Sequence, residues 1–229
     1  MGKERSKLVL FIVEGQSEMN ALYPIMKNRF RPDQVLFHIY KGDLTVKNYG
    51  QGTPVKEVEK ILNEEMHKYG LTRTDIREVI ELTDTDGIFL PDEAIMFSEE
   101  ASHIQYTDDG VFTAYPDSIL ERNSKRRKNL EVLITTHELK RGIPFRVYYL
   151  SRNIEHALYG IDRGVSDNRK TDLAYEFSDR FGFNYRGLLR YLTEEQVTLG
   201  RNYTDSWDEI KRGLESVRRH TNLQLVLED

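Results

Sequence analysis

The chain has 229 residues, of which 38% are hydrophobic and 31% charged, a balance typical of a folded globular protein rather than a disordered one. It contains no cysteine, which excludes disulfides, thiolate zinc sites, iron–sulfur clusters and a cysteine nucleophile. The formal net charge of −5 excludes binding of nucleic acid through bulk positive charge, so any nucleic-acid site must be a local patch. No apolar run approaches the roughly 18 residues of a membrane span, and no signal peptide is recognisable, so we expect a cytoplasmic protein.

The first predicted strand is the apolar run at residues 7–13. Its near-continuous hydrophobicity is typical of a strand that is covered on both faces, as parallel strands are, so we expect it at the centre of a sheet. The strand ends in Glu-Gly-Gln-Ser, where glycine permits a tight turn and Ser17 can cap a following helix. Apolar residues at helical spacing support this helix, which Pro24 would kink or shorten.

A second predicted strand, residues 35–40, precedes a polar stretch and then the most regular helical pattern of the chain. Thr53 is a suitable N-cap, Pro54 suits the first helical position, and apolar residues follow at helical spacing until Gly70 stops the helix. The next apolar run, residues 76–82, predicts a third strand and ends in Thr-Asp-Thr-Asp-Gly. The third strand, like the first, is therefore followed by carboxylates.

Residues 91–122 interrupt this alternation, and we interpret them as an insertion. Alternating apolar arms flank Asp109-Gly110, which is a typical hairpin turn, so the insertion should contain a hairpin. The chain shows no internal repeat and no low-complexity segment.

The second half of the chain returns to alternating elements. Ser124 can cap a helix that runs toward Gly142, and residues 145–150 predict a fourth strand. Ser-Arg-Asn at 151–153 then opens a helix that contains Glu155.

The element order predicts an α/β fold with a mostly parallel, Rossmann-like sheet and helices on both faces, by the right-handed crossover rule. The chain from about residue 165 is mainly helical, and its last apolar alternation, residues 223–227, predicts an edge strand or a frayed tail. We therefore expect an α/β domain at residues 1–160, with an insertion at about 91–122, and a mainly helical C-terminal extension at residues 161–229.

Acidic residues follow three of the predicted strands. Glu14 follows the first strand, Asp84 and Asp86 follow the third, and Glu155 follows the fourth. Ligands of open α/β sheets bind beyond the carboxyl ends of the strands, so we expect these side chains near one another. Asp84 and Asp86 point the same way if the chain stays extended, and can then present two oxygen ligands to one cation. Glu18, on the helix face of Glu14, is a further candidate.

Carboxylates that are brought together repel one another and raise each other's pKa, so a divalent cation or basic side chains must neutralise them. Oxygen ligands without histidine or cysteine favour Mg²⁺ or Mn²⁺. Each residue also has an ordinary explanation. Glu-Gly and Asp-x-Asp are common in turns, Glu155 would suit the dipole at a helix start, and Glu18 could be a solvated helix residue.

Val-Glu-Gly-Gln-Ser-Glu after the first strand and Asp-Thr-Asp-Gly after the third resemble the motifs of the Toprim fold. This fold is the metal-binding catalytic domain of DnaG-type primases, topoisomerases and nucleases of the overcoming-lysogenization-defect type. The resemblance implies that Glu14, Asp84 and Asp86 bind Mg²⁺ and act in catalysis. The form of the first motif is similar to that of the nuclease branch, in which a second Glu at the position of Glu18 can join the metal site.

A closer likeness is to the RloB-type phage-defence proteins, whose pattern Ser-Asn-x-x-x-Glu is similar to Ser-Arg-Asn-Ile-Glu at 151–155, with a spacing that differs by one residue. The resemblance covers roughly residues 5–160 and implies that Glu155 is a further metal ligand. No Gly-x-x-x-x-Gly-Lys-Ser/Thr loop occurs in the chain, so the ATPase that often accompanies the nuclease branch would have to be a separate partner.

The resemblance implies a divalent-metal-dependent nuclease that cleaves phosphodiester bonds in DNA or RNA, in phage defence or in a mobile element. One or two Mg²⁺ or Mn²⁺ ions would activate water and stabilise charge during in-line attack. Basic side chains would contact nucleic acid, and the candidates are Lys125, Arg126, Arg127, Lys128, Arg152, Arg169 and Lys170. A helix start does not favour cations, so the run 125–128 at a predicted helix start favours phosphate contact, with a solvated surface patch as the alternative.

Other classes remain open. A catalytically silent Toprim-like binding or regulatory module, acting with a protein partner, would need few changes from the enzyme. A metal-dependent phosphatase of the haloacid-dehalogenase type has a similar Asp-x-Asp motif, but that motif normally follows the first strand of the fold. A metal-dependent glycosyltransferase would not account for Glu14, and the chain has no Gly-x-Ser-x-Gly elbow of a serine hydrolase.

Overall fold

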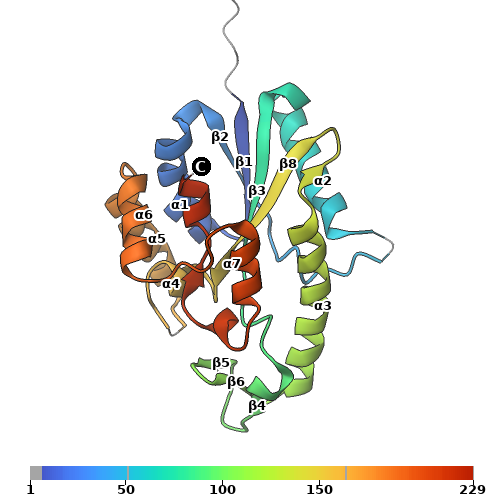
Figure 1. Ribbon diagram of the computed structural model, residues 1–229, viewed down its shortest axis with the longest axis vertical. Coiled ribbons are helices and arrows are strands. Elements are labelled where there is room, and N and C mark those ends of the chain that lie inside the picture. Colours follow the sequence, from blue (N-terminus) through green and yellow to red (C-terminus); the bar gives the residue numbers. More distant parts are fainter. Residues whose placement is uncertain (1–6, 51, 163, 229) are drawn as a thin grey trace, which may run out of the picture. The chain divides into compact units, whose positions relative to one another are not determined.

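The sheet of this protein is made from the apolar runs that predict strands. The computed structural model describes residues 7–50, 52–162 and 164–228 and has an α/β fold, with a mostly parallel sheet flanked by helices (Figure 1). The strands of this sheet are β1 (Leu8–Val13), β2 (Val35–Ile39), β3 (Ile76–Asp84), β7 (Glu138–Leu139), β8 (Ile143–Ser151) and β9 (His220–Thr221). Their order is β2-β1-β3-β8-β7, and β9 pairs antiparallel with the end of β8.

The interior position of β1 explains its continuous hydrophobicity. β1 pairs in parallel with β2, where Phe11 lies opposite Phe37, and with β3, where Phe11 lies opposite Ile80. The rings of Phe11 and Phe37 stack with centroids 4.9 Å apart. All residues from Val9 to Val13 are buried, so no face of the strand carries polar residues.

The helices alternate with these strands. They are α1 (Gln16–Phe30), α2 (Pro54–Lys68), α3 (Pro116–Thr135), α4 (Ile154–Ala157), α5 (Asp167–Phe181), α6 (Tyr185–Glu194), α7 (Tyr203–Ile210) and α8 (Gln224–Glu228). Short 3-10 turns occur at Pro32–Gln34, Arg73–Asp75, Asp92–Ala94 and Glu215–Val217. α1 leads from β1 to β2 and α2 leads back from β2 to β3, so right-handed crossovers place these two helices on opposite faces of the sheet (Figure 1). Within the described residues, no helix has both the length and the apolar character to cross a membrane.

α2 begins and ends as its sequence predicts. The hydroxyl of Thr53 accepts a hydrogen bond from Lys56 N at 3.3 Å and caps the first turn. At the other end Gly70 has a φ of 62°, and Leu71 N donates to Met66 O at 2.8 Å. This left-handed glycine closes the last turn and satisfies a carbonyl that the helix leaves open.

α1 differs from its prediction in two respects. Its N-cap is Gly15, so Ser17 lies inside the first turn and does not cap the helix. The helix also continues through Pro24 to Phe30. Proline removes one backbone hydrogen bond, at a cost of about 3 kcal/mol, and burial of the apolar face of α1 offsets this cost.

α3 starts earlier in the chain than predicted. It begins at Pro116, and Ser124 is exposed inside the helix instead of capping it. Proline at the first helical position is a start signal, and the interpretation of residues 91–122 as one insertion obscured it. The run 125–128 therefore lies in the middle of a helix, and the argument that it stands at a helix start was wrong.

Residues 91–122 contain the predicted hairpin within a second, smaller sheet. Its strands are β4 (Ile95–Phe97), β5 (Gln105–Thr107) and β6 (Gly110–Thr113), in the order β4-β6-β5. β5 and β6 are antiparallel, and their turn is Asp108-Asp109, one residue before the predicted position. The added strand β4, parallel to β6, was not predicted because it makes no local hairpin.

The chain divides into two compact units, each made of separate segments. The first contains the residues up to Leu82, Asn129–Tyr148 and Thr171–Tyr185. The second contains Thr83–Lys128, Tyr149–Lys170 and the residues from Arg186 on. This grouping is not the predicted division at residue 160, which stays a prediction.

The second unit has its own aromatic core. The Trp207 ring lies edge-on to Tyr149, with centroids 4.9 Å apart, and to Phe89 at 6.5 Å. Asn222 joins this core, because its side chain accepts a hydrogen bond from Tyr149 N at 2.8 Å and donates one to Ser206 Oγ at 3.0 Å. The last apolar alternation of the chain forms α8, so its interpretation as a strand was wrong.

Candidate functional site at the ends of β3 and β8

Two acidic segments that the sequence analysis singled out separately lie side by side in the second unit. Asp84 is the last residue of β3. Beyond it, Thr85 N donates to Leu150 O and Asp86 N donates to Arg152 O, both at 3.0 Å. The Asp-x-Asp segment therefore continues as a neighbour of the end of β8, as expected for the carboxyl ends of adjacent strands.

The chain turns sharply at Asp86. Asp86 has a φ of 46° and Gly87 a φ of 70°, and Ile88 N donates to Thr85 O at 2.8 Å. Positive φ at both central residues is the pattern of a type I′ turn, for which Asp-Gly is a favoured sequence. We expected Asp84 and Asp86 to point the same way if the chain stayed extended. The chain turns at Asp86, so this condition is not met. A Cβ on Gly87 would lie 2.8 Å from Val217 Cγ1, so the turn also requires glycine for space.

Two arginines of α3 hold this turn. Arg126 is 2% exposed and donates to Asp86 Oδ2 at 3.1 Å and to Asp84 O at 2.9 Å. Arg122, one helical turn earlier, donates to Asp86 O at 3.3 Å. The sequence left open whether a divalent cation or basic side chains neutralise the carboxylates. For Asp86, the neutralising group in the structure is a guanidinium. Arg122 was missed because α3 was expected to start after it.

The rest of the basic run faces elsewhere. Lys125 and Lys128 are exposed, whereas Arg126 on the same helix is buried against the β3 turn. Arg127 is half-buried, and its guanidinium lies 3.6 Å from Asp92 Oδ1. Only part of this run is therefore on the surface of the second unit.

The end of β8 carries a buried, neutral histidine. Asn153 accepts a hydrogen bond from His156 N at 3.0 Å and caps α4. His156 Nδ1 lies 2.9 Å from Ser151 O and 3.1 Å from Arg152 N, so it can donate to the first or accept from the second. Burial, and then the positive charge of Arg152, lower the pKa of His156 to about 4. The imidazole is therefore uncharged at neutral pH and positions the strand end.

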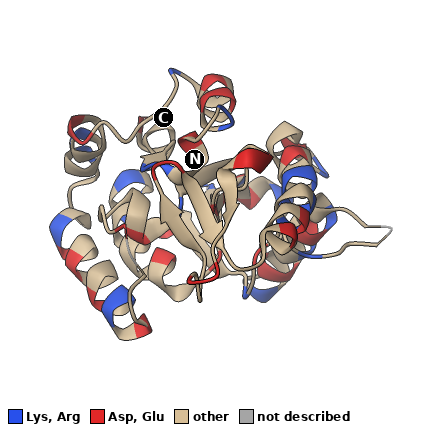
Figure 2. Cartoon of the chain, turned by 90° about the horizontal axis from the view of Figure 1, so that it is seen from below, with Lys and Arg blue, Asp and Glu red and all other residues tan. Residues whose placement is uncertain are grey.

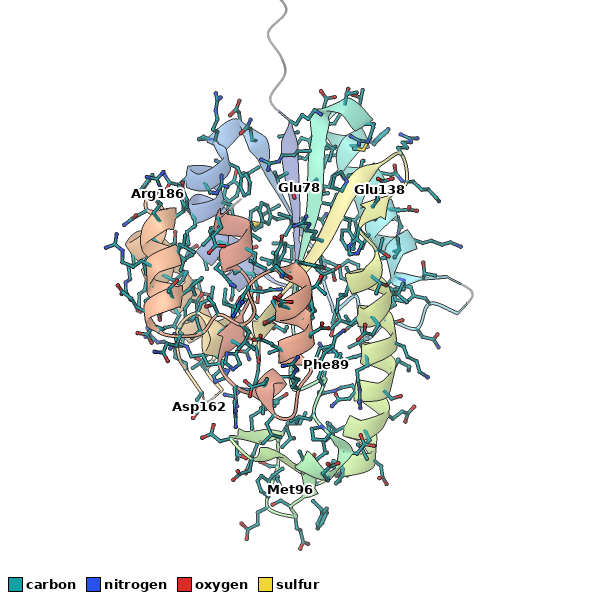
Figure 3. The ribbon with its side chains drawn as sticks, in the orientation of Figure 1. Glu78, Phe89, Met96, Glu138, Asp162 and Arg186 are labelled. Atoms are coloured by element: carbon teal, nitrogen blue, oxygen red, sulfur yellow. The ribbon has the colours of Figure 1, made fainter. Side chains whose placement is uncertain are left out.

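Arg152 is held in place by three groups. It is 5% exposed, and its guanidinium lies 4.8 Å from the ring centroid of Tyr106. Its Nη2 donates to Asp162 O at 2.8 Å and to Asp162 Oδ1 at 3.3 Å, while the Asp162 side chain is largely exposed (Figure 3). Burial, and then the Asp86 carboxylate, raise the pKa of Tyr106 to about 12, so the phenol stays neutral. Tyr106 lies in the hairpin, and no sequence pattern connected it with the site.

A small pocket adjoins these residues. It has a volume of about 200 Å³, and Arg152, Glu155 and Lys170 contribute to its lining. Glu155 is 5% exposed, and its Oε1 lies 3.7 Å from Lys170 Nζ. Pockets for drug-sized ligands have roughly 300–1,000 Å³, so this pocket suits a group of the size of one phosphate. Arg169, the other predicted cation of this segment, is exposed.

Glu14 and Glu18 belong to the first unit, so the candidate site is described without them. Glu14 follows β1 and is half-buried. Glu18 lies in the first turn of α1 and is buried, so it is not the solvated residue of the ordinary explanation. A Cβ on Gly15 would lie 2.9 Å from Glu18 Oε2, and the absence of a side chain there leaves room for this carboxylate.

The divalent ion that the sequence predicts stays a prediction. Oxygen-only ligands would suit Mg²⁺ or Mn²⁺. However, the described residues contain no group of three or more His, Asp or Glu side chains that could hold an ion. Asp86 and Glu155 instead contact the cations Arg126 and Lys170. The predicted metal site therefore remains without structural support.

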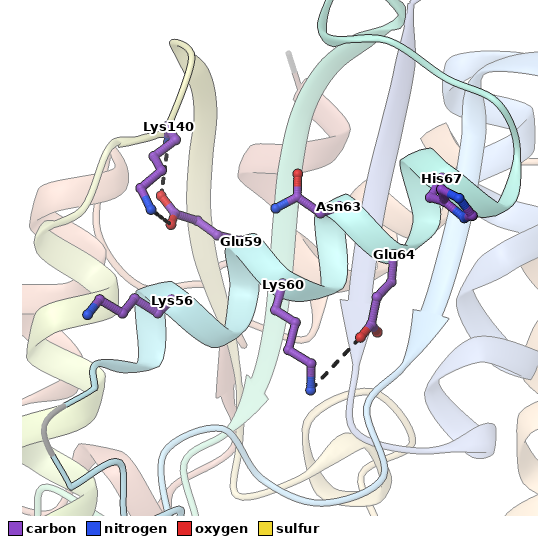
Figure 4. Close-up of a pocket in the computed structure, with 7 residues that line it drawn as sticks. All are labelled: Lys56, Glu59, Lys60, Asn63, Glu64, His67 and Lys140. Atoms are coloured by element: carbon purple, nitrogen blue, oxygen red, sulfur yellow. Dashed lines mark hydrogen bonds and ion pairs between the residues drawn. The ribbon is translucent and has the colours of Figure 1, made fainter.

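Another hollow, of about 590 Å³, lies on the exposed side of α2 in the first unit (Figure 4). Its charged residues pair with one another: Lys140 Nζ lies 3.1 Å from Glu59 Oε2, and Lys60 Nζ lies 3.9 Å from Glu64 Oε1. Acidic and basic residues are similarly interspersed along the helices of the protein (Figure 2). Exposed pairs of this kind are ordinary surface features, so we assign this hollow no function.

The chain was also compared with known proteins. It matched no protein-family model, no curated protein and no solved structure. The candidate site therefore rests on its residues and their geometry.

Proposed function

We propose that this chain cleaves phosphodiester bonds of nucleic acid, with its reaction at the ends of β3 and β8. The observation that carries the proposal is the pairing of the Asp-x-Asp turn with the β8 end, through the hydrogen bond from Asp86 N to Arg152 O at 3.0 Å. The pairing brings together two motifs that lie far apart in the sequence. The same unit also contains the pocket of the size of one phosphate.

The pocket is lined by the cations Arg152 and Lys170 and by the carboxylate residues Glu155 and Asp162, a combination that suits this chemistry. Arg152 and Lys170 would bind the anionic phosphate, and Arg152 is pre-positioned by Tyr106 and Asp162. Glu155 would orient an attacking water and accept its proton, because its carboxylate lines the same pocket. Arg126 would keep the Asp86 turn in one conformation during the reaction.

Metal dependence is a separate part of the proposal. Mg²⁺ or Mn²⁺, where bound, would supply charge stabilisation and an activated water. Since the described side chains do not form an ion site, none of the roles above depends on the ion. A nucleic-acid substrate and a partner ATPase are likewise proposals, which come from the resemblance to Toprim nucleases.

The test is cleavage of supercoiled plasmid and of single-stranded RNA by the full chain, in Mg²⁺, in Mn²⁺ and in chelator. Glu155→Gln should reduce the cleavage rate at least about a hundredfold, because it removes the proton acceptor. Asp86→Asn should also reduce the rate, because it weakens the contact with Arg126 that holds the turn beside the pocket. Asparagine tolerates a positive φ, so Asp86→Asn keeps the turn. The matched control is Asp208→Asn, which neutralises an exposed carboxylate on α7 of the same unit and should cleave like wild type.

A second candidate function is a silent binding module for a phosphate-bearing ligand. One observation favours it, namely that Asp86 and Glu155 already contact Arg126 and Lys170. In that case wild type would show no cleavage under any metal condition but would bind nucleic acid, and Arg152→Ala would weaken binding. Cleavage that both Asp86→Asn and Glu155→Gln retain in full would contradict the proposed site.

A further inference from the structure

A groove in the first unit is formed by α1, the 3-10 turn after it and the connection from α5 to α6. Its volume is about 560 Å³, within the range of roughly 300–1,000 Å³ that ligand pockets have. Tyr23, Lys27, Arg31 and Phe183 are among its lining residues. None of these residues belongs to the unit of the candidate site.

Gly182 and Pro24 form one wall of the groove. A Cβ on Gly182 would lie 2.6 Å from Ser178 O of α5 and 3.1 Å from Pro24 Cβ of α1, so this position requires glycine. Gly182 N donates to Ser178 O at 2.6 Å and closes a tight turn. The next residue, Phe183, follows this turn with 94% of its surface exposed. An aromatic ring so exposed gains no burial in the free protein, and a ligand would cover it.

The charge of the groove is positive. Its lining contains Lys27 and Arg31 and no carboxylate. Lys27 Nζ lies 4.4 Å from the ring centroid of Tyr23. Arg31 Nε lies 3.7 Å from Asp33 Oδ1, but both side chains are mostly exposed, and an ion pair of that kind is weak. An anionic ligand with a flat apolar part complements this combination of cations and an aromatic ring.

We infer that the groove binds one unpaired nucleotide of a single-stranded nucleic acid, with its base stacked on Phe183 and its phosphate beside Lys27 and Arg31. The inference rests on the proposed function and makes single strands the substrate class. Stacking on an aromatic side chain needs an exposed base face, which a duplex does not offer. An acidic peptide that binds by strand addition would instead need a strand edge, and the lining residues belong to a helix, a 3-10 turn and a loop.

The test is fluorescence anisotropy with a short labelled oligo(U) strand, a labelled duplex of equal length and a labelled acidic peptide, all in chelator so that cleavage does not interfere. Phe183→Ala should weaken binding of the strand by between about fivefold and a hundredfold, the range expected for loss of one base stack. Lys27→Ala should lower the slope of log affinity against log salt by about 0.7, as expected for one phosphate contact on a single strand. Phe183 is exposed, so its replacement should leave the thermal midpoint unchanged.

The matched control is Tyr175→Ala, which removes an exposed aromatic ring from α5 of the same unit outside the groove and should bind like wild type. Equal affinity of wild type and Phe183→Ala for the strand would overturn the inference. The inference would also be overturned if the acidic peptide bound more tightly than the single strand and Phe183→Ala abolished binding of the peptide. The groove would then be a protein-docking site.

Asp86→Asn separates this inference from the proposed function. Binding that depends on Phe183 and persists in Asp86→Asn, together with no cleavage by wild type in any metal, would support the groove and contradict the nuclease. Cleavage that depends on Asp86, together with binding of the single strand that does not depend on Phe183, would support the nuclease and contradict the groove.

Discussion

Glu81 shows how burial changes the ionisation of a carboxyl group. It lies in β3, is 3% exposed, and its Oε2 has no hydrogen-bond partner among the described residues. Burial, and then the nearby charge of Asp43, raise the pKa of Glu81 to about 8. The side chain is therefore protonated in the folded protein at neutral pH.

This raised pKa predicts a pH-dependent stability. In the unfolded chain Glu81 ionises near its ordinary pKa of 4.5, whereas the folded chain keeps the proton up to about pH 8. The contribution of Glu81 is therefore fully present below pH 4.5 and is lost as the pH rises to about 8. Glu81→Gln should be more stable than wild type at pH 9, by on the order of 3–5 kcal/mol, with little difference at pH 4.

Urea unfolding of both proteins at several pH values measures this difference. The control is Glu64→Gln on the exposed face of α2, for which the difference from wild type should not change with pH by more than about 0.5 kcal/mol. Parallel stability curves for wild type and Glu81→Gln would contradict the assignment of a raised pKa.

At the scale of elements, α2 and α3 show how much depends on the position of one hydroxyl side chain. Thr53 caps α2, whereas Ser124, also a predicted cap, lies inside α3. Thr53→Ala should lower the free energy of unfolding by about 1 kcal/mol, because a helix N–H loses its acceptor. Ser124→Ala should change it by less than about 0.5 kcal/mol, since alanine is the better residue inside a helix. Urea unfolding of the pair measures both effects, and an equal loss in the two variants would contradict the start of α3 at Pro116.

The packing of α3 against the β3 turn depends on Arg126. Arg126→Met keeps the length of the side chain but removes its hydrogen bonds to Asp84 O and the Asp86 carboxylate, so we expect a loss of about 2 kcal/mol. Trp207 is the single tryptophan of the chain and lies in the same unit, so its fluorescence in urea reports this unfolding. Lys128→Met, an exposed cation on the same helix, is the control and should stay within about 0.5 kcal/mol of wild type. A similar midpoint for both variants would show that Arg126 is not a structural residue.

At the scale of the whole molecule, the α/β class follows from local patterns. Continuous apolar runs predicted β1, β2, β3 and β8, and the period of the apolar residues predicted α2 with correct ends. These elements were predictable because burial on both faces, or on one helical face, leaves its period in the sequence itself. β4 and α8 were not predicted, because a short apolar segment fits a strand or a helix equally well until its neighbours decide.

The candidate site was predictable only in part. The strand-end positions of Asp84 and Asp86 follow from an apolar run that stops before them, so the sequence predicted them correctly. The groups that surround them come from distant segments: Arg126 from α3, and Tyr106 from the small sheet. Local propensity contains no information on such partners, since they depend on how separate elements pack.

The amino-acid sequence alone determined the lack of thiols, the carboxylates that follow the strands and the succession of the main strands along the chain, because composition and apolar period are local properties. Only the tertiary structure decided that the chain turns at Asp86, that Arg126 balances this carboxylate, and that Glu81 Oε2 has no hydrogen-bond partner among the described residues. The reason is electrostatic. A charge in the interior is stabilised or neutralised by whatever group the fold places within a few ångströms of it, and that group can lie far away along the chain.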